Sequence, residues 1–180
     1  MAHLQIVPKD PFGWWVTGLV DGEGCFYAGL NYRTKRTTSG RLVECVELQA
    51  EMAVCLRADD LGALEKLERW FGCGKINKKT TSAQAPSVIK QGIRPNPMRR
   101  FVVRAPEDLV SAVIPHFESY PLQSKKANDF EVWRSVVEFA SERLIGKKGW
   151  LRRFPKEVAA LESKCSELKA GRVYAGGSRG

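Results

Sequence analysis

Apolar residues near the start of the chain recur every three or four positions, and the pattern then changes to alternation. The apolar positions of the first pattern are Phe12, Trp15, Val16, Leu19 and Val20. This spacing predicts a helix with one apolar face that ends at about residue 22. The alternation that follows predicts strands at residues 24–32 and 41–56, joined by a polar loop.

The second of these strands has two different faces. Val46, Met52 and Val54 lie on one parity, whereas the other parity includes Glu47 and Gln49. Successive side chains of a strand point to opposite faces of a sheet, so we expect one face in the core and one polar face.

A second helix and a second hairpin are predicted next. The helix covers residues 61–71, with Asp59 and Asp60 as its start signals. The hairpin covers residues 74–80 and 98–104, with a long loop between its strands.

Helices dominate the last part of the chain. One starts at Pro106 and is expected to break near Pro115, another has Phe130 and Trp133 on its apolar side, and the last starts at Pro155. The predicted order is helix, two strands, helix, two strands and then helices, which indicates an α+β fold.

Length and composition suit one globular domain, since the chain has 180 residues of which 43% are hydrophobic. No apolar run approaches the roughly 18 residues that a membrane span needs, so we expect an intracellular protein without a membrane partner. The five cysteines are odd in number and are never spaced as Cys-x-x-Cys, which predicts reduced, buried thiols. His3 and His116 lack partners at metal-ligand spacing, which argues against a zinc site.

The net charge of +9 is concentrated in two segments. Residues 24–43 contain four basic residues and residues 75–104 contain eight, and neither segment contains an acidic residue. An ordinary solvated surface would mix the two signs. The concentration of positive charge on two predicted hairpins therefore favours a nucleic acid as partner.

Residues 16–24 read V-T-G-L-V-D-G-E-G and place two acidic residues among glycines at the end of the first helix. Gly18 and Gly22 lie four apart, and each costs roughly 1 kcal/mol in a helix relative to alanine, which indicates a face made for close packing. If two copies of this helix packed side by side, their carboxylates would lie close together and would need cations between them. The simpler alternative is that Asp21 and Glu23 are only turn residues at a helix end.

This stretch resembles the LAGLIDADG motif of homing endonucleases, with Gly18, Leu19, Asp21 and Gly24 matching the motif letter for letter. The order of the predicted elements extends the resemblance over about residues 12–139. It implies an α-β-β-α-β-β-α fold with a saddle-shaped antiparallel sheet and helices on one face. The expected divisions are a LAGLIDADG core domain at residues 1–141, a C-terminal helical extension at 142–170 and a flexible tail at 171–180.

The resemblance implies a site-specific, intron-encoded double-strand DNA endonuclease, which hydrolyses phosphodiester bonds in a long, partly palindromic site with a divalent metal ion. Because the chain has one motif, the resemblance also implies a homodimer that pairs through the motif helix. The residues expected at that interface are Val16, Thr17, Gly18, Asp21 and Gly22.

Glu23 is similar in position to the family's metal-binding acid, and the backbone carbonyl of Gly22 is expected to join it around Mg²⁺. The resemblance further implies auxiliary catalytic residues among Gln123, Lys125 and Lys126, where Gln123 stands in the place of a lysine in some relatives. An equally open interpretation is that the two lysines form a solvated pair at a helix start.

The implied sheet would lie along the DNA major groove, and strand parity then selects the side chains that face the bases. Those expected to contact bases are Tyr27, Asn31, Arg33, Glu47, Gln49, Glu51, Asn77, Lys79 and Arg100, and those expected to contact phosphates are Lys35, Arg36 and Arg41. Each of them alone is also an ordinary exposed strand residue, so the prediction depends on the set.

Two other functions stay open at this stage. The first is an RNA-binding splicing factor, or maturase, that acts on its host intron, since a basic sheet suits either polymer. The second is a DNA-binding protein that keeps the fold without catalysis, and the retention of Glu23 between two glycines argues against it. The expected compartment is a bacterial or archaeal cytoplasm, or an organelle such as a mitochondrion or chloroplast.

Overall fold

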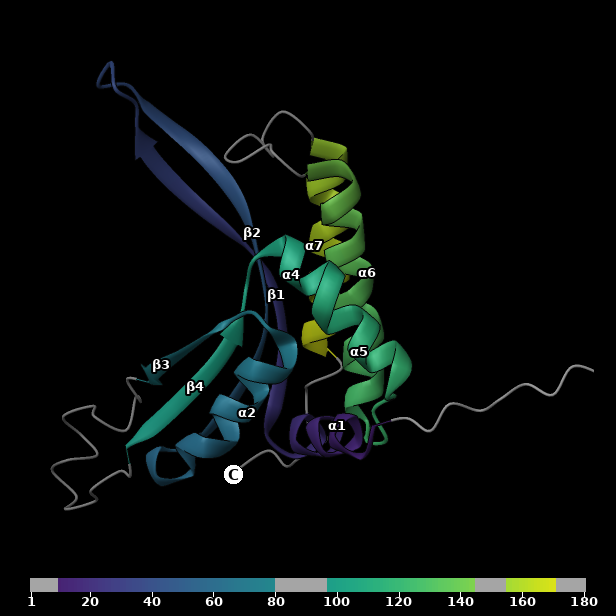
Figure 1. Cartoon of the computed structure of the whole chain (residues 1–180). Coiled ribbons are helices and arrows are strands. Elements are labelled where there is room, and N and C mark those ends of the chain that lie inside the picture. Colours follow the sequence, from purple (N-terminus) through teal and green to yellow (C-terminus); the bar gives the residue numbers. More distant parts are fainter. Residues whose placement is uncertain (1–9, 80–96, 145–154, 171–180) are drawn as a thin grey trace, which may run out of the picture.

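The chain forms one antiparallel sheet with helices packed against one of its faces (Figure 1). The structure is a computed structural model that describes residues 10–79, 97–144 and 155–170. Along these residues the elements follow the order helix, two strands, helix, two strands and then helices. This order confirms the predicted α+β fold.

The first helix, α1, spans Pro11–Glu23 and begins where the side chain of Asp10 accepts a hydrogen bond from the backbone N–H of Phe12 at 2.8 Å. Its buried stripe consists of Gly13, Val16, Thr17 and Val20. Gly13 is required in this stripe, because a Cβ atom there would lie 2.4 Å from the ring of Tyr120. The position of α1 therefore depends on a close approach of its backbone to an aromatic ring.

Two residues that we expected at an interface between copies lie inside the chain's own core. Val16 is fully buried and Thr17 is 1% exposed. The buried stripe is rotated toward Gly13, so that Trp15, expected on the apolar face, is 38% exposed. Since neither Val16 nor Thr17 has a side-chain surface to offer to a second copy, their assignment to the interface is corrected.

The sheet is built on a long hairpin. β1 (Gly24–Arg36) and β2 (Leu42–Arg57) pair along their whole length, while β4 (Met98–Val103) pairs with residues 52–57 of β2 and with β3 (Lys75–Lys79). The strand order is β1-β2-β4-β3. Within the described sheet, residues 27–36 and 42–51 pair only with each other, and we call this two-stranded part the ribbon. Figure 1 shows that it extends away from the rest of the sheet.

The ribbon is longer than the sequence pattern predicts. The polar loop expected at residues 33–40 is shorter, because strand pairing continues to Arg36 opposite Leu42. The chain reverses where the N–H of Thr37 donates to the carbonyl of Arg41 at 2.8 Å, with Gly40 at a φ of 82° that favours glycine. The polar side chains of the ribbon are compatible with strands, because the hydrogen bonds between paired strands are made by backbone groups.

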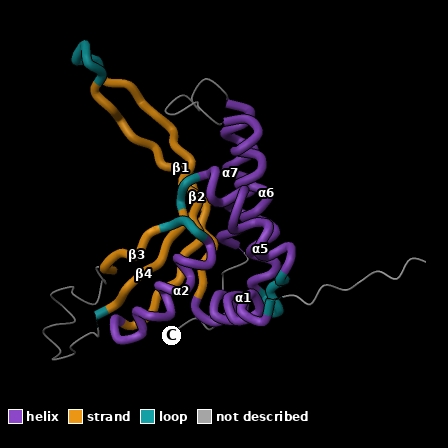
Figure 2. Tube along the Cα trace, viewed as in Figure 1, coloured by secondary structure: helices purple, strands orange, loops and turns teal. Residues whose placement is uncertain are grey.

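Even-numbered positions of β1 and β2 face the helices. Phe26, Met52 and Val54 belong to the buried core together with Phe101 and Val103 of β4. The helices that cover this face include α2 (Leu61–Phe71), α6 (Lys126–Leu144) and α7 (Pro155–Ala170), as Figure 2 shows. The odd-numbered positions of β1 and β2 form the other face, together with the positions in register with them, such as Arg100 of β4 and Asn77 of β3. The described helices leave this face open, and we call it the open face.

Helix α2 has the predicted bounds, but its start is built differently. A 3-10 turn, η1 (Ala58–Asp60), precedes it, and the Asp60 side chain makes no capping hydrogen bond. Asp59 instead accepts hydrogen bonds from Arg57 at 3.1 and 2.7 Å. The two acids act through the negative charge that they place near the start of the helix rather than as caps.

The helices after β4 form a continuous stretch. It consists of α4 (Pro106–Asp108), a π-helical turn η3 (Leu109–Val113) and α5 (Ile114–Ser119). The predicted break near Pro115 does not occur, because the wider turn directly before it accommodates a residue without an N–H. No helix in the described part of the chain is long and apolar enough to cross a membrane.

The last two helices pack into the same core as the sheet. α6 continues past residue 142, so the expected boundary between a core domain and an extension falls inside this helix. α7 buries Leu161, Cys165 and Leu168 in the common core cluster. We therefore propose that the C-terminal extension is an addition to one domain; the expected tail at residues 171–180 lies outside the described residues.

The cysteines are less buried than we expected. All five are free thiols, as predicted, but only Cys165 is buried. Cys25 is exposed, and Cys45 and Cys55 are half-buried. The reason is strand parity, because these three residues occupy odd-numbered positions and therefore lie on the open face.

A buried histidine joins three helices. The ring Nδ1 of His116 accepts a hydrogen bond from the indole N–H of Trp70 at 3.1 Å, which leaves the proton on Nε2, 3.2 Å from the hydroxyl of Thr17. Thr17 in turn donates to the carbonyl of Tyr120 at 2.8 Å. Burial lowers the pKa of His116 to about 4. The neutral ring therefore connects α1, α2 and α5 at neutral pH.

We expect acid to weaken the fold through His116. The pKa of this residue is about 6.5 in an unfolded chain and about 4 in the folded one, so between these values the unfolded chain binds more protons and gains stability as the pH falls. The loss of unfolding free energy from pH 7 to pH 4 should be on the order of 3 kcal/mol. Urea unfolding at several pH values measures it. His116→Gln should remove this part of the pH dependence, and an unchanged pH dependence in that variant would contradict the assignment.

Candidate nucleic-acid interface and metal site

The end of α1 and the start of α6 are joined by side-chain contacts. The carboxylate of Asp21 accepts hydrogen bonds from the backbone N–H of Gln123 at 2.8 Å and from the hydroxyl of Ser124 at 2.7 Å. The Ser124 hydroxyl oxygen also accepts the N–H of Lys126, the first residue of α6, at 3.1 Å. Asp21 thus places a negative charge at the N-terminus of α6, where free N–H groups favour it.

Lys126, at the start of α6, contacts the end of α1 in return. Its ammonium group donates to three backbone carbonyls at the end of α1, those of Val20 at 3.1 Å, Asp21 at 2.7 Å and Gly22 at 3.1 Å. The last carbonyls of a helix lack the donors of a continuing turn and form its negative end, so a cation is favourable there. The two helix ends therefore neutralise each other.

The three residues predicted to assist catalysis occupy different environments. Lys126 lies at the end of α1 through the contacts just described. The side-chain amide of Gln123 donates to the carbonyl of Pro121 at 2.8 Å, and Lys125 is exposed. Lys126 is therefore not a solvated lysine at a helix start, the alternative that the sequence left open for it.

Glu23, the predicted metal-binding acid, is the last residue of α1, and it is exposed directly before β1. Its carboxylate and the carbonyl of Gly22 are oxygen donors of the kind that Mg²⁺ prefers, so their chemistry fits a divalent ion. Within the described residues, no three or more His, Cys, Asp or Glu side chains form a group that could hold a metal. The Glu23 carboxylate and the Gly22 carbonyl alone would make up only part of a coordination shell, so a bound ion would need further oxygens from a second copy, a phosphate or water.

One face of α1 is open to solvent and is formed by very small residues. A Cβ atom at Gly18 or at Gly22 would meet nothing within 4 Å. Trp14 and Trp15, one turn earlier, are 42% and 38% exposed. Packing inside this chain thus requires neither glycine, although each lowers helix stability. Close contact with another chain would explain both.

The open face carries most of the predicted recognition residues. Asn31 donates to Gln49 at 3.1 Å across the ribbon, and Lys35 forms an ion pair with Glu47. The hydrogen bond from Lys35 lowers the pKa of Glu47, so this carboxylate is charged at neutral pH. Side chains of the ribbon therefore pair with each other across its two strands.

Glu51 differs from its prediction as a base-contacting residue. It is 5% exposed, and its carboxylate accepts hydrogen bonds from Arg100 and, at 2.7 Å, from Arg104. A carboxylate that is buried needs such partners. Its burial leaves no surface for a base, so the prediction is wrong for Glu51, which instead positions two arginines.

The remaining predicted contacts are spread over both hairpins. Arg33 and Asn77 are exposed on the open face, and Tyr27 is half-buried there. Arg36 donates to the carbonyl of Gly40 at 3.1 Å in the turn, next to the exposed Arg41. The side chain of Lys79 and the long loop after it lie outside the described residues.

Two basic residues of this region were missed. Arg104 follows β4 and pairs with Glu51, and Lys75 is exposed on β3, two positions before Asn77. Strand parity could have found Lys75, because it shares the face of Asn77. The pairing of Arg104 with Glu51 joins residues 53 positions apart, and nothing in the local pattern indicates it.

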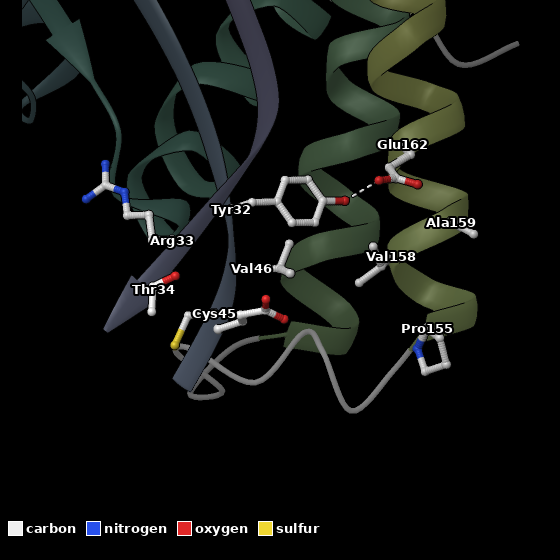
Figure 3. Close-up of a pocket in the computed structure, with 10 residues that line it drawn as sticks. Tyr32, Arg33, Thr34, Cys45, Val46, Pro155, Val158, Ala159 and Glu162 are labelled. Carbon is white, nitrogen blue, oxygen red and sulfur yellow. Dashed lines mark hydrogen bonds between the residues drawn. The ribbon is translucent and has the colours of Figure 1, made fainter. Parts of the chain in front are cut away.

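A cavity of about 430 Å³ lies between the ribbon and α7 (Figure 3). Tyr32 and Val46 line it from the ribbon, and Val158 and Glu162 line it from α7. The hydroxyl of Tyr32 donates to Glu162, while Arg33 points away from α7. α7 thus meets the ribbon through Tyr32, while Arg33 borders the cavity with its side chain directed away from α7.

The fold and the site together define an α+β protein with an open polar sheet face and an exposed acid at the end of a glycine-containing helix. The sequence model of LAGLIDADG endonucleases matches residues 16–137, from α1 into α6. The chain therefore belongs to the LAGLIDADG endonuclease family. α7 lies beyond the matched region.

Three similar proteins extend this comparison. An uncharacterized 50.9 kDa protein in ND4 intron 1 of Podospora anserina is 27% identical over 128 residues, which are 71% of this chain and 24% of that protein. The chain thus spans about a quarter of the length of this relative. The homing endonuclease I-TnaI matches with a TM-score of 0.62 and 22% identity, over 88% of this chain and 94% of its own. I-SmaMI bound to uncleavable DNA matches with a TM-score of 0.63 and 19% identity, over 92% of this chain and 46% of its own.

We expect Asp21→Asn to destabilise the chain. An amide keeps one acceptor oxygen but loses the charge that the N-terminus of α6 favours, so the free energy of unfolding should fall by about 1–2 kcal/mol. Urea unfolding at pH 7 measures it. Asp59→Asn is a matched control at an exposed ion pair, where the loss should stay below about 1 kcal/mol. Equal losses in both variants would contradict the capping role.

Proposed function

We propose that this chain is a site-specific, metal-dependent DNA endonuclease that acts as a homodimer on both strands of a long duplex. The observation that carries the proposal is the position of Glu23. This exposed acid ends a helix whose open side includes Gly18 and Gly22, and it directly precedes the strand that begins the open face. Along the sequence, the glycines proposed to pair two copies come first, the acid proposed to bind the metal ion comes next, and the strand proposed to contact DNA follows.

The choice of DNA as partner rests on charge and on the relatives. The chain has a net charge of +9, and Arg33, Asn77 and Arg100 lie on the open face. Arginine suits phosphates and guanine edges, and asparagine suits adenine edges. I-SmaMI, which shares the fold, is described as bound to DNA. The open face is therefore the surface that we assign to the duplex.

The choice of a homodimer rests on the exposed side of α1. Gly18 and Gly22 leave open space on this side, where a second α1 can approach closely. A chain with one motif also matches 46% of the I-SmaMI chain, so two copies correspond to about the length of that protein. Pairing through α1 would bring two Glu23 carboxylates together, one for each DNA strand.

In this mechanism the open face binds and orients the duplex. Arg100 and Arg104 are positioned by Glu51 before the DNA arrives, so less side-chain freedom is lost on binding. Glu23 and the carbonyl of Gly22 would hold the divalent ion beside the scissile phosphate. When bound, such an ion supplies an activated water and offsets the negative charge that develops at the phosphate.

The relative in an ND4 intron favours one second candidate, which is binding of a host intron RNA. A basic sheet attracts either polymer through its phosphates. The two functions differ in their product, because an RNA-binding factor leaves duplex DNA intact. Selection of cleaved molecules from a random duplex library with Mg²⁺ tests the endonuclease. Recovery of one long, partly palindromic site would support it, and recovery of no cleaved site would favour the RNA candidate.

We expect Glu23→Gln to separate DNA binding from cleavage. The amide keeps the size of the side chain but loses the charge that balances a divalent ion, and loss of such an interaction commonly reduces turnover by roughly 100-fold or more. Binding depends on strands away from this residue, so affinity measured with Ca²⁺ should stay within about threefold. Cleavage of the selected site with Mg²⁺, compared between wild type and variant, is the measurement. Cleavage at the wild-type rate would show that Glu23 does not hold the ion.

We expect Gly18→Leu to abolish the dimer without unfolding the chain. A side chain at Gly18 has open space within one copy, whereas two closely packed helices would be forced apart. Analytical ultracentrifugation should therefore show a monomer, with a thermal transition close to that of wild type. Gly62→Leu is the matched control, since Gly62 lies in α2 and a Cβ atom there also meets nothing within 4 Å. A Gly18→Leu protein that stays dimeric would exclude α1 as the interface.

A further inference from the structure

The ammonium group of Lys126 contacts the same carbonyl that is expected to bind a metal ion. Its Nζ lies 3.1 Å from the carbonyl oxygen of Gly22 and also donates to the carbonyls of Val20 and Asp21. The ammonium group of Lys126 thus already places a positive charge at the end of α1, the helix whose last residue is Glu23. The side chain that supplies this charge comes from α6, more than 100 residues later.

We propose that Lys126 is a built-in counter-cation of this site, and that a divalent ion at Glu23 and Gly22 binds against its charge. The inference rests on the metal site proposed above. Lys126 stabilises the end of α1 when no ion is bound, and the same contact lowers the affinity of the free protein for the ion. Lys126 is a positioning residue in this role, because it holds the carbonyls at the end of α1 and opposes the ion through its charge without coordinating it.

Lys126 and the divalent ion oppose each other through their charges, and not because the Gly22 oxygen lacks room for both. A carbonyl oxygen has two lone pairs, so the oxygen of Gly22 could accept a hydrogen bond and also coordinate an ion. The ammonium group and a divalent ion on one oxygen are nevertheless only a few Å apart and repel each other. Lys126 must therefore withdraw from Gly22, or the ion must bind more weakly.

The same contact addresses a problem of the proposed dimer. Two Glu23 carboxylates brought together by α1 would repel each other unless cations lie nearby. Two Lys126 side chains, one from each copy, supply positive charge at the ends of the two helices without any bound ion. The metal-free dimer is then stabilised by its own residues, and divalent ions bind most readily once DNA phosphates add negative charge.

The test compares metal affinity with stability in the full chain without DNA. Mn²⁺ is titrated into wild type, Lys126→Met and Lys156→Met, and free Mn²⁺ is followed by electron paramagnetic resonance. Lys126→Met should bind Mn²⁺ roughly tenfold more tightly, the size that water-screened repulsion between these charges gives at a few Å. The same variant should unfold at a lower temperature without Mn²⁺, and added Mn²⁺ should raise its transition more than that of wild type. Lys156→Met, at an exposed lysine of α7, is the matched control and should bind within about twofold of wild type.

A lysine that only caps the helix predicts a different result. In that case Lys126→Met would lower stability and leave Mn²⁺ affinity unchanged or weaker, and this outcome overturns the proposal. If Lys126→Met does not fold, Lys126→Gln keeps a donor for the carbonyls without the charge and should also bind Mn²⁺ more tightly. Lys126→Arg keeps the charge and should not.

Glu23→Gln separates a failure of this inference from a failure of the metal site. Loss of Mn²⁺ binding in Glu23→Gln places the ion at the proposed site, so an unchanged affinity in Lys126→Met then overturns only the role of Lys126. Mn²⁺ binding that survives Glu23→Gln, or no binding by either wild type or Lys126→Met, overturns the metal site and this inference with it. Cleavage of the selected duplex remains a separate measurement of the endonuclease.

Discussion

The structure depends on the junction where the C-terminal end of α1 meets the N-terminal end of α6. Helix ends of opposite polarity lie there, and each is neutralised by a side chain of the other helix, Asp21 in one direction and Lys126 in the other. α1 runs without a linker into β1, and the indole N–H of Trp133 in α6 donates to the carbonyl of Tyr27 in β1 at 3.1 Å. The junction thus fixes helix, strand and Glu23 relative to one another.

Local patterns predicted the elements well because their causes are local. The spacing of apolar residues gave the bounds of α2, and the alternation in β2 separated the core face from the open face before any contact was known. Asp21 and Glu23 were distinguished through the resemblance of one short motif. The metal-binding role of Glu23 stays a prediction.

Three features could not be read from the sequence because they depend on contacts between distant residues. The buried stripe of α1 includes Gly13 rather than Trp15, since the ring of Tyr120 takes the space of a side chain there. Glu51 is buried because Arg100 and Arg104 come to it from another hairpin. Lys126 reaches α1 across more than 100 residues. In each case the sequence shows the residue type but not the distant residue that it contacts.

The ion pairs of the open face are of two kinds, which differ in how much stability is lost when one partner turns away. Lys35 and Glu47 are exposed, and such a pair contributes little to stability, so either partner can turn to another charge. Glu51 is buried between two arginines, and removal of one partner would leave a charge without compensation. The part of the ribbon around Lys35 and Glu47 is therefore adaptable, and the end of the ribbon at Glu51 is rigid.

The ribbon also has a consequence for how this protein can change over time. Within the described sheet its two strands pair only with each other, and α7 meets it through Tyr32. Apart from Glu51, which pairs with Arg100 of β4, the odd-numbered positions of the ribbon can therefore be substituted without removing a described ion pair to another strand, and the hydrogen bond from Tyr32 to Glu162 of α7 is kept. If the open face binds DNA as proposed, a lineage under selection for a new target can exchange these residues one at a time and keep Glu23 unchanged, and a protein engineer can begin a redesign at the same positions.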